Sequence, residues 1–271
     1  MKIILQYHLR LGDIIRLFPL ARHLAAQDKT NEIFIECLPK YESIFGLVDY
    51  VKWKQPDAPL KDASGKPLYD ALYPLQIWPA RAQAYRTKQP PLRFTDFLTS
   101  GFPDEFRGIQ KAITFTKLPP IEHVLAKYKL PAAYSLACPA GFCENIRGDY
   151  GLSRPIDFHI FENWWIHSIK PRGALYYLSP LSSGMNRQFV HVTDLSEIST
   201  LIQHAIDFAT ILSAPAVIAS ARFEKKPLRE KWHYVSPIDP ISRALDDIGA
   251  KEQVRWEVEL NAATPRIVPQ K

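Results

Sequence analysis

The sequence predicts an α/β protein in which short parallel strands alternate with helices. Short apolar runs alternate along the chain with segments whose apolar residues recur at helical spacing, a pattern typical of parallel crossovers. The opening pattern, a strand followed by a glycine-containing break, returns at residues 133–141, after a proline-rich crossing at residues 118–131. We therefore expect two units, at residues 1–130 and 131–271.

The first unit begins with an apolar run and a helical pattern. Four strands are expected, at Lys2–Tyr7, Glu32–Cys37, Val48–Trp53 and Tyr69–Leu75. Apolar residues spaced as Ile14, Leu17, Leu20 and Leu24 predict a helix from Asp13, and a shorter helix is expected at Pro39–Leu47. Residues 55–67 are polar and rich in proline, which predicts a surface loop. The segments Trp78–Lys88 and Phe94–Leu98 are helical in composition.

The second unit follows the same alternation. Strands are expected at Ala133–Cys138, Ala174–Ser179, Phe189–Val192 and Phe208–Leu212, and helices at Ile121–Tyr128, Ile156–Lys170, from Asp194 onward, at Ser213–Ala221 and at Asp239–Ile248. Thr193 or Asp194 is suited to cap its helix, with Glu197 in the first turn. Phe158, Phe161, Trp164 and Trp165 give the helix at Ile156–Lys170 an aromatic face for the core.

Composition sets the broad class of the protein. The 271 residues, 46% of them hydrophobic, suffice for a large core, and no apolar run approaches the ~18 residues of a spanning helix. The N-terminus shows no signal-peptide pattern, so we expect a cytoplasmic protein. The three cysteines form no C-x-x-C pair, which indicates buried free thiols. A net charge of +6 suits a polyanionic partner without identifying one.

The break after the first strand offers a candidate for chemistry. Gly12 permits backbone conformations that other residues resist, and Asp13 stands where a carboxylate is suited either to cap the helix or to face a ligand. The cap alone would be worth about 1 kcal/mol to the helix.

This opening, strand, Leu11-Gly12-Asp13 and a helix carrying the early Pro19, resembles the heptosyltransferase-like glycosyltransferases of family 9. The resemblance implies a GT-B fold, two Rossmann-like domains facing a central cleft. It also implies that Asp13 is the base that deprotonates the acceptor hydroxyl, in a single displacement that inverts the anomeric centre.

A second stretch, DLSEISTLIQHAIDFATILSAPAVIASA, resembles the family's passage that holds the nucleotide-sugar donor. The sequence departs from the family there, because Ser213-Ala214-Pro215 replaces the usual Asp-Ser-Gly and no histidine follows in the helix. The residues expected to contact the donor are Gly12, Ser182, Ser183, Arg187, Asp194, Glu197, Ser213 and Ala214. The sequence contains no D-x-D motif that would suggest a metal ion bound to the diphosphate. Helix N-termini and a basic side chain such as Arg147 or Arg187 are therefore expected to offset the negative charge of the leaving diphosphate. The donor is a co-substrate, and no cofactor is expected.

The acceptor is predicted to be polyanionic. The family default is a lipopolysaccharide core, but the shortness of the chain and the lack of a basic amphipathic membrane helix tilt the expectation toward a hydroxymethylated base in DNA. Basic and aromatic residues would contact it, at Trp78, Arg81, Tyr85, Arg86, Lys225, Lys226, Arg229 and Trp232. For Trp78–Lys88, a solvated helix with its aromatics in the core is an equal alternative. A non-catalytic nucleotide-binding relative also stays open, whereas an oxidoreductase lacks its G-x-G-x-x-G fingerprint.

Overall fold

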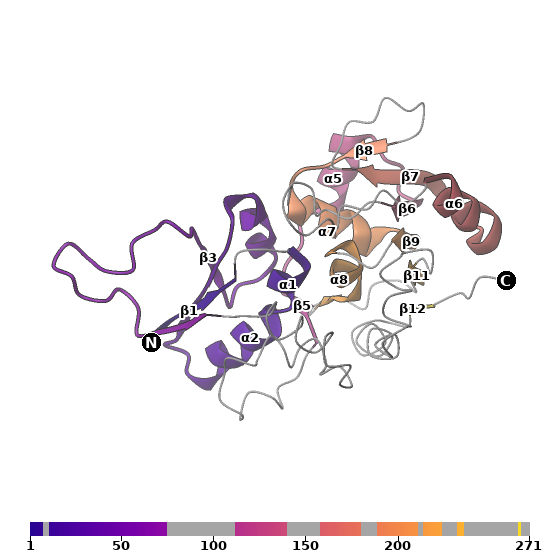
Figure 1. The fold of residues 1–271 in the computed structure, drawn as a ribbon. Coiled ribbons are helices and arrows are strands. Elements are labelled where there is room, and N and C mark those ends of the chain that lie inside the picture. The colour runs from indigo at the N-terminus through magenta and orange to yellow at the C-terminus, as the bar shows by residue number, and fades with distance from the viewer. Residues whose placement is uncertain are drawn as a thin grey trace.

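The protein contains two parallel β-sheets and a two-stranded pairing between them. A computed structural model describes residues 1–7, 11–74, 112–139, 158–179, 189–210, 214–223, 232–235 and 265–266. Every pairing between its named strands is parallel, and described helices follow β1, β2, β5, β6, β8 and β9 (Figure 1). The predicted α/β class is confirmed.

The first sheet has the strand order β3-β2-β1-β4. Its strands are β1 (Lys2–Gln6), β2 (Glu32–Glu36), β3 (Lys52–Lys54) and β4 (Ala71–Pro74). The third strand starts later than Val48, where it was expected, because the chain bends at Asp49 and Tyr50, and Val48 and Val51 are buried on either side of this bend. The loop between β3 and β4, predicted at residues 55–67, is largely exposed and projects from the sheet (Figure 1).

The first helix of the sequence prediction is two helices in the structure, α1 (Leu11–Ile15) and α2 (Phe18–Gln27). The break follows from Pro19, which has no N–H for Ile15 and whose ring would clash with the carbonyl of that residue. Proline is well suited to the first turn of α2, where the N–H would have no helical partner. The expected short helix at Pro39–Leu47 is a 3₁₀ helix, η1.

The second sheet has the order β12-β11-β9-β6-β7-β8. Its strands are β6 (Tyr134–Cys138), β7 (Ala174–Ser179), β8 (Phe189–His191), β9 (Asp207–Thr210), β11 (Trp232–Val235) and β12 (Pro265–Arg266). Numbered within the sheet, this is the Rossmann order 3-2-1-4-5-6, and the first sheet repeats its 3-2-1-4 part. The predicted strands of this unit are present.

Helices α5 (Ile121–Tyr128), α7 (Leu195–His204) and α8 (Ala214–Ser220) agree with the sequence prediction. The helix expected at Ile156–Lys170 is α6 (Phe158–Asn163), which continues as the π-helix η3 (Trp164–Ile169). Its aromatic face is core as predicted, since Phe161, Trp164 and Trp165 are buried against the second sheet.

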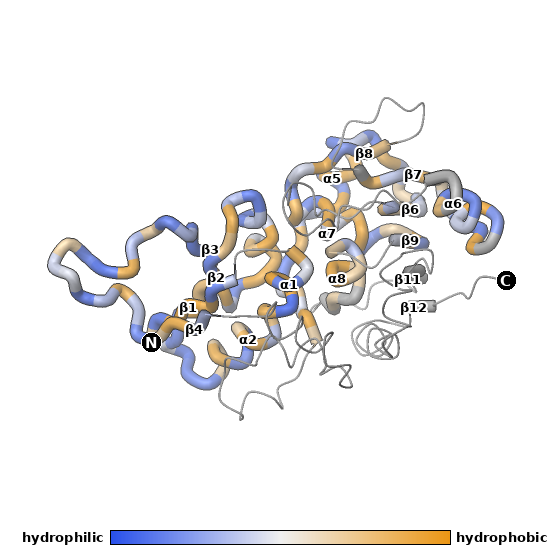
Figure 2. The backbone as a smooth tube through the Cα atoms, in the orientation of Figure 1, coloured by the Kyte–Doolittle hydropathy of each residue, from blue (hydrophilic) through white to orange (hydrophobic). Residues whose placement is uncertain are grey.

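One hydrophobic core extends from the first sheet to the second. It includes Leu5 and Ile35 of the first sheet, Leu136 and Phe208 of the second, and residues of the helices between them. Figure 2 shows stretches of hydrophobic residues in these helices. Strands β5 (Thr114–Phe115) and β10 (Arg222–Phe223) also pair across the two halves. The boundary expected after residue 130 falls between α5 and β6, and the division into two domains stays a prediction.

Several expected segments lie outside the described residues: the helices at Trp78–Lys88, Phe94–Leu98 and Asp239–Ile248, and residues 224–231, which include Lys225, Lys226 and Arg229. Among the helices that are described, none combines the length and apolar character needed to cross a bilayer.

Candidate active site

Asp13 lies at the end of the first sheet, in the first turn of α1. The helix begins at Leu11, so Asp13 is not its N-cap, contrary to the simpler sequence interpretation. Its carboxylate is 7% exposed and accepts a hydrogen bond of 2.5 Å from the hydroxyl of Tyr7, which is 4% exposed. Tyr7 directly follows β1, and its backbone N–H donates to the carbonyl of Glu36. A buried carboxylate with a fixed partner therefore stands at the carboxyl end of β1.

Gly12 is where α1 meets α8. A methyl group on Gly12 would lie 3.4 Å from the Cα of Ala214 and 3.4 Å from Cγ2 of Val217. The φ angle of Gly12 is not positive, so the glycine serves close helix packing and not the unusual backbone expected from the sequence. The two helices lie side by side between the sheets (Figure 1). The structure thus brings together Gly12, Asp13 and Ala214, three of the predicted site residues.

The second sheet presents its topological switch point to the same region. Strand order reverses between β6 and β9, where Cys138 and Thr210 are paired at the carboxyl ends, and the Thr210 hydroxyl donates to the Cys138 carbonyl at 3.1 Å. Ligands of open α/β sheets bind outside the carboxyl ends of the strands at such a point. Helix α8, which follows β9, is the helix that contacts α1.

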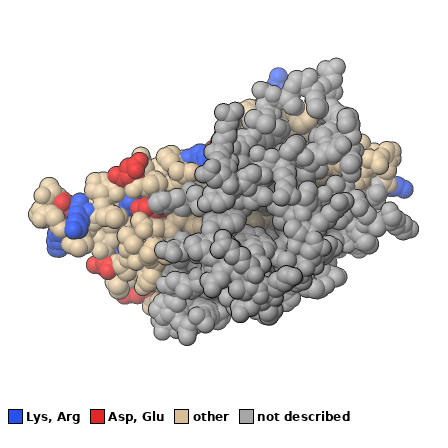
Figure 3. Space-filling model, in the orientation of Figure 1, with Lys and Arg blue, Asp and Glu red and all other residues tan. Residues whose placement is uncertain are grey.

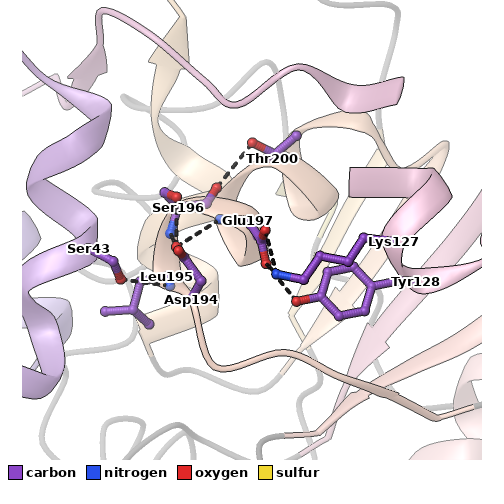
Figure 4. A network of polar contacts seen from close by, with 8 residues as sticks. All are labelled: Ser43, Lys127, Tyr128, Asp194, Leu195, Ser196, Glu197 and Thr200. Carbon is purple, nitrogen blue, oxygen red and sulfur yellow. Dashed lines mark hydrogen bonds and ion pairs between the residues drawn. The ribbon is translucent and has the colours of Figure 1, made fainter. Parts of the chain in front are cut away.

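Asp194 and Glu197 have structural partners at the start of α7 (Figure 4). Asp194 caps the helix by accepting hydrogen bonds from the N–H groups of Ser196 and Glu197, as the sequence predicted. The remaining N–H at this end, that of Leu195, donates to the Ser43 hydroxyl of η1. Protein groups therefore occupy these three N–H groups, and contact of Asp194 with a donor stays a prediction.

Glu197 joins α7 to α5. Its carboxylate contacts the Lys127 ammonium at 2.8 Å and accepts a hydrogen bond from the Tyr128 hydroxyl at 2.6 Å (Figure 4). Burial, together with this carboxylate, raises the pKa of Tyr128 to about 12. Through these contacts Glu197 links α7 to α5. Its predicted contact with the donor stays a prediction.

A polar row, which sequence reasoning missed, crosses the end of the first sheet, and two of its three residues, Glu36 and Lys54, are buried. Gln6, Glu36 and Lys54 are in register on adjacent strands. The Lys54 ammonium contacts the Glu36 carboxylate at 2.5 Å and donates to the carbonyls of Gln55 and Ala58, while Gln6 donates to Glu36. Charged residues at the ends of two predicted strands, Glu36 and Lys54, are the signal that would have suggested the pair.

The other predicted donor residues, Ser182, Ser183, Arg187 and Ser213, lie outside the described residues, as does Arg147. Of the residues that the sequence predicts to contact the acceptor, Trp232 begins β11, and the others lie outside the described residues. On the face shown in Figure 3, the described Lys and Arg side chains are interspersed with Asp and Glu. The described residues on this face therefore gather no basic patch.

The described residues offer little for metal or thiol chemistry. Within the described ranges, no group of three or more His, Cys, Asp or Glu side chains is arranged to hold a metal ion. Cys37 and Cys138 are buried free thiols, as expected from the sequence, and Cys143 lies outside the described residues. Burial and the neighbouring Glu36 raise the pKa of Cys37 to about 12.

Two parallel sheets whose carboxyl ends meet across packed helices are the arrangement of a GT-B protein, and comparison with solved structures confirms that fold. Structural neighbours include a family 9 glycosyl transferase from Veillonella parvula, with a TM-score of 0.51, 10% identity, and coverage of 88% of this chain and 81% of that one. Another is the heptosyltransferase WaaC of E. coli solved with ADP, with a TM-score of 0.50, 12% identity and 89% of each chain covered.

A third neighbour is the iron-containing dodecameric glycosyltransferase TibC from enterotoxigenic E. coli. Its TM-score is 0.50 at 14% identity, and the match covers 81% of this chain but 57% of that longer one. No protein-family model and no curated protein matches the sequence. At these identities the likeness concerns the fold.

Proposed function

We propose that this protein is a glycosyltransferase that moves a sugar from a nucleotide-sugar donor to an acceptor hydroxyl. The observation that carries the proposal is the packing of α1 on α8. It puts the turn that holds Asp13 beside the helix that follows the switch strand β9. The family 9 and heptosyltransferase neighbours support the proposal, and the ADP bound to one of them makes an adenosine diphosphate sugar the first donor to test.

In the proposed reaction Asp13 is the general base. Its carboxylate takes the proton of the acceptor hydroxyl while that oxygen forms a bond to the anomeric carbon. The bond from the anomeric carbon to the diphosphate oxygen breaks, and the diphosphate leaves with the electron pair. A single displacement of this kind inverts the configuration. Burial keeps water from the carboxylate, which strengthens its electrostatic contact with the acceptor proton.

Two acceptor classes stay in the proposal. A hydroxymethylated DNA base is the sequence-based choice, and the basic side chains on which it depends lie outside the described residues. A saccharide of the lipopolysaccharide core is the acceptor that the family resemblance implies, and one neighbour is named a heptosyltransferase. Both acceptors are polyanionic, in keeping with the net charge of +6.

The test of the proposed base is Asp13→Asn, which keeps the size of the side chain and its ability to accept from Tyr7. We expect transfer to fall by roughly 10²–10⁴-fold while the fold persists, because the amide has no basicity. Asp28→Asn is the matched control, since Asp28 is an exposed carboxylate that accepts from the N–H of Thr30. Transfer products are measured by mass spectrometry with both acceptors and a panel of nucleotide sugars. Normal turnover of Asp13→Asn would place the base elsewhere.

The same experiment separates the enzyme from a non-catalytic nucleotide-binding relative. A transferase releases nucleoside diphosphate when donor and acceptor are both present, and a binding module releases none. If no donor in the panel is consumed with either acceptor, the proposed function is wrong.

A further inference from the structure

Tyr7 holds the carboxylate of Asp13 in a fixed place. Its backbone is fixed because its N–H donates to the carbonyl of Glu36 at 3.1 Å. Strand geometry sends adjacent side chains to opposite faces, so Tyr7 lies on the face opposite Gln6 and its polar row. That is the face of Leu5, which belongs to the core shared with α1. The phenol ring therefore lies on the side of the sheet that α1 covers, and its hydroxyl donates a hydrogen bond to Asp13 of that helix.

The hydrogen bond has a chemical consequence for a carboxylate in this setting. A hydroxyl that donates to a carboxylate favours its ionised form, whereas burial favours the neutral form. It also restricts rotation of the carboxylate, and a base that is misplaced by about 1 Å loses up to about 10²-fold in rate. The hydrogen bond therefore opposes the effect of burial on the charged form and orients the carboxylate before an acceptor binds.

We propose that Tyr7 is a positioning residue for Asp13, acting through its hydroxyl hydrogen bond to orient the proposed base and to favour its charged form. The proposal rests on the proposed function, in which Asp13 deprotonates the acceptor. Tyr7 itself need not touch the substrate.

The test is Tyr7→Phe, which removes one oxygen and leaves the ring to pack. We expect kcat to fall by about 10- to 100-fold and the acid limb of the pH–rate profile to move up by about one pH unit. Tyr134→Phe is the matched control: the Tyr134 hydroxyl is also buried and donates at 2.7 Å, but to the carbonyl of Leu201. That variant is expected to lose stability and to keep the wild-type pH–rate profile.

A second measurement does not require activity. In protein labelled with ¹³C at the aspartate carboxyls, the Asp13 signal is identified by its loss in Asp13→Asn and titrated in wild type and Tyr7→Phe. The midpoint is expected to be higher in Tyr7→Phe by about one pH unit, since the hydrogen bond to the charged form is gone.

The outcomes separate the two proposals. An unchanged midpoint, or an unchanged pH–rate profile in an active Tyr7→Phe enzyme, would overturn the role of Tyr7 and leave the glycosyltransferase proposal standing. The same profile change in Tyr134→Phe would also overturn it, because the effect would then be general. A shifted midpoint in a protein whose wild type transfers no sugar would refute the proposed function, and with it the positioning role.

Discussion

The contact between α1 and α8 should limit the size of the side chain at position 12. An alanine Cβ would lie at van der Waals distance, 3.4 Å, from Ala214 and Val217. Alanine is favoured over glycine in a helix by about 1 kcal/mol, which offsets this close contact. We therefore expect Gly12→Ala to keep the free energy of unfolding within about 1 kcal/mol of the wild type.

Gly12→Val should behave differently. Its γ carbons extend about 1.5 Å beyond Cβ, into space that the neighbouring helix already fills. Overpacking of this kind costs about 1–3 kcal/mol through displaced side chains or backbone. Of the two displaced helices, α1 carries Asp13 and α8 follows the switch strand β9. Transfer activity should therefore fall as well.

The assay is urea unfolding followed by circular dichroism, with the same substitutions at Gly46 as the control. Gly46 is exposed, and a methyl group added to it would have no atom within 4 Å, so Gly46→Val meets no neighbour. Its cost should stay below about 1 kcal/mol. Should Gly12→Val prove as stable as Gly12→Ala, or lose no more than Gly46→Val, the close packing of α1 and α8 is refuted.

Two further predictions follow from raised pKa values. Burial raises the pKa of Cys37 to about 12, so iodoacetamide at pH 8 should label Cys37 only after denaturation, as read by peptide mass spectrometry; prompt labelling of the folded protein would contradict this. The pKa of Tyr128 is raised to about 12 from 10.0, and burial also raises the pKa of Tyr134. Both side chains therefore stay protonated in the folded state at a pH where the unfolded chain ionises. Stability is therefore expected to be intact below pH 10 and to fall as the pH rises toward 12, whereas equal urea midpoints at pH 9.5 and 11 would contradict it.

The fold was largely predictable because its signals are local. Buried parallel strands read as short apolar runs, and the cap at Asp194 can be identified from neighbouring residues alone. The break between α1 and α2 was missed although Pro19 indicates it, because the helical spacing continues through the break. Strand β3 was placed too early because the sequence does not distinguish buried valines beside a bend from valines in a strand.

The candidate site was predictable only in part. Asp13 was identified from its turn and a family resemblance, but its partner Tyr7 was not, since no local pattern reports which side chains meet between a strand and a helix. The prediction that Gly12 adopts an unusual backbone conformation was wrong for a similar reason. Its close contact with Ala214 involves a residue that is far away in the sequence. The pairing of Glu36 with Lys54 likewise depends on sheet register, which sequence alone leaves open.

The hydrophobic core that the two sheets share also affects folding during translation. A ribosome releases the first sheet and α1 before α7 and α8 exist, although those helices cover η1 and α1 in the finished protein. Until they emerge, the parts of η1 and α1 on which α7 and α8 pack lack these neighbours, and the hydrophobic core that they share is incomplete. Nascent chains that expose such surface are prone to aggregate and are typical clients of chaperones. The first half of this protein is therefore expected to need protection during translation until α8 has been synthesised.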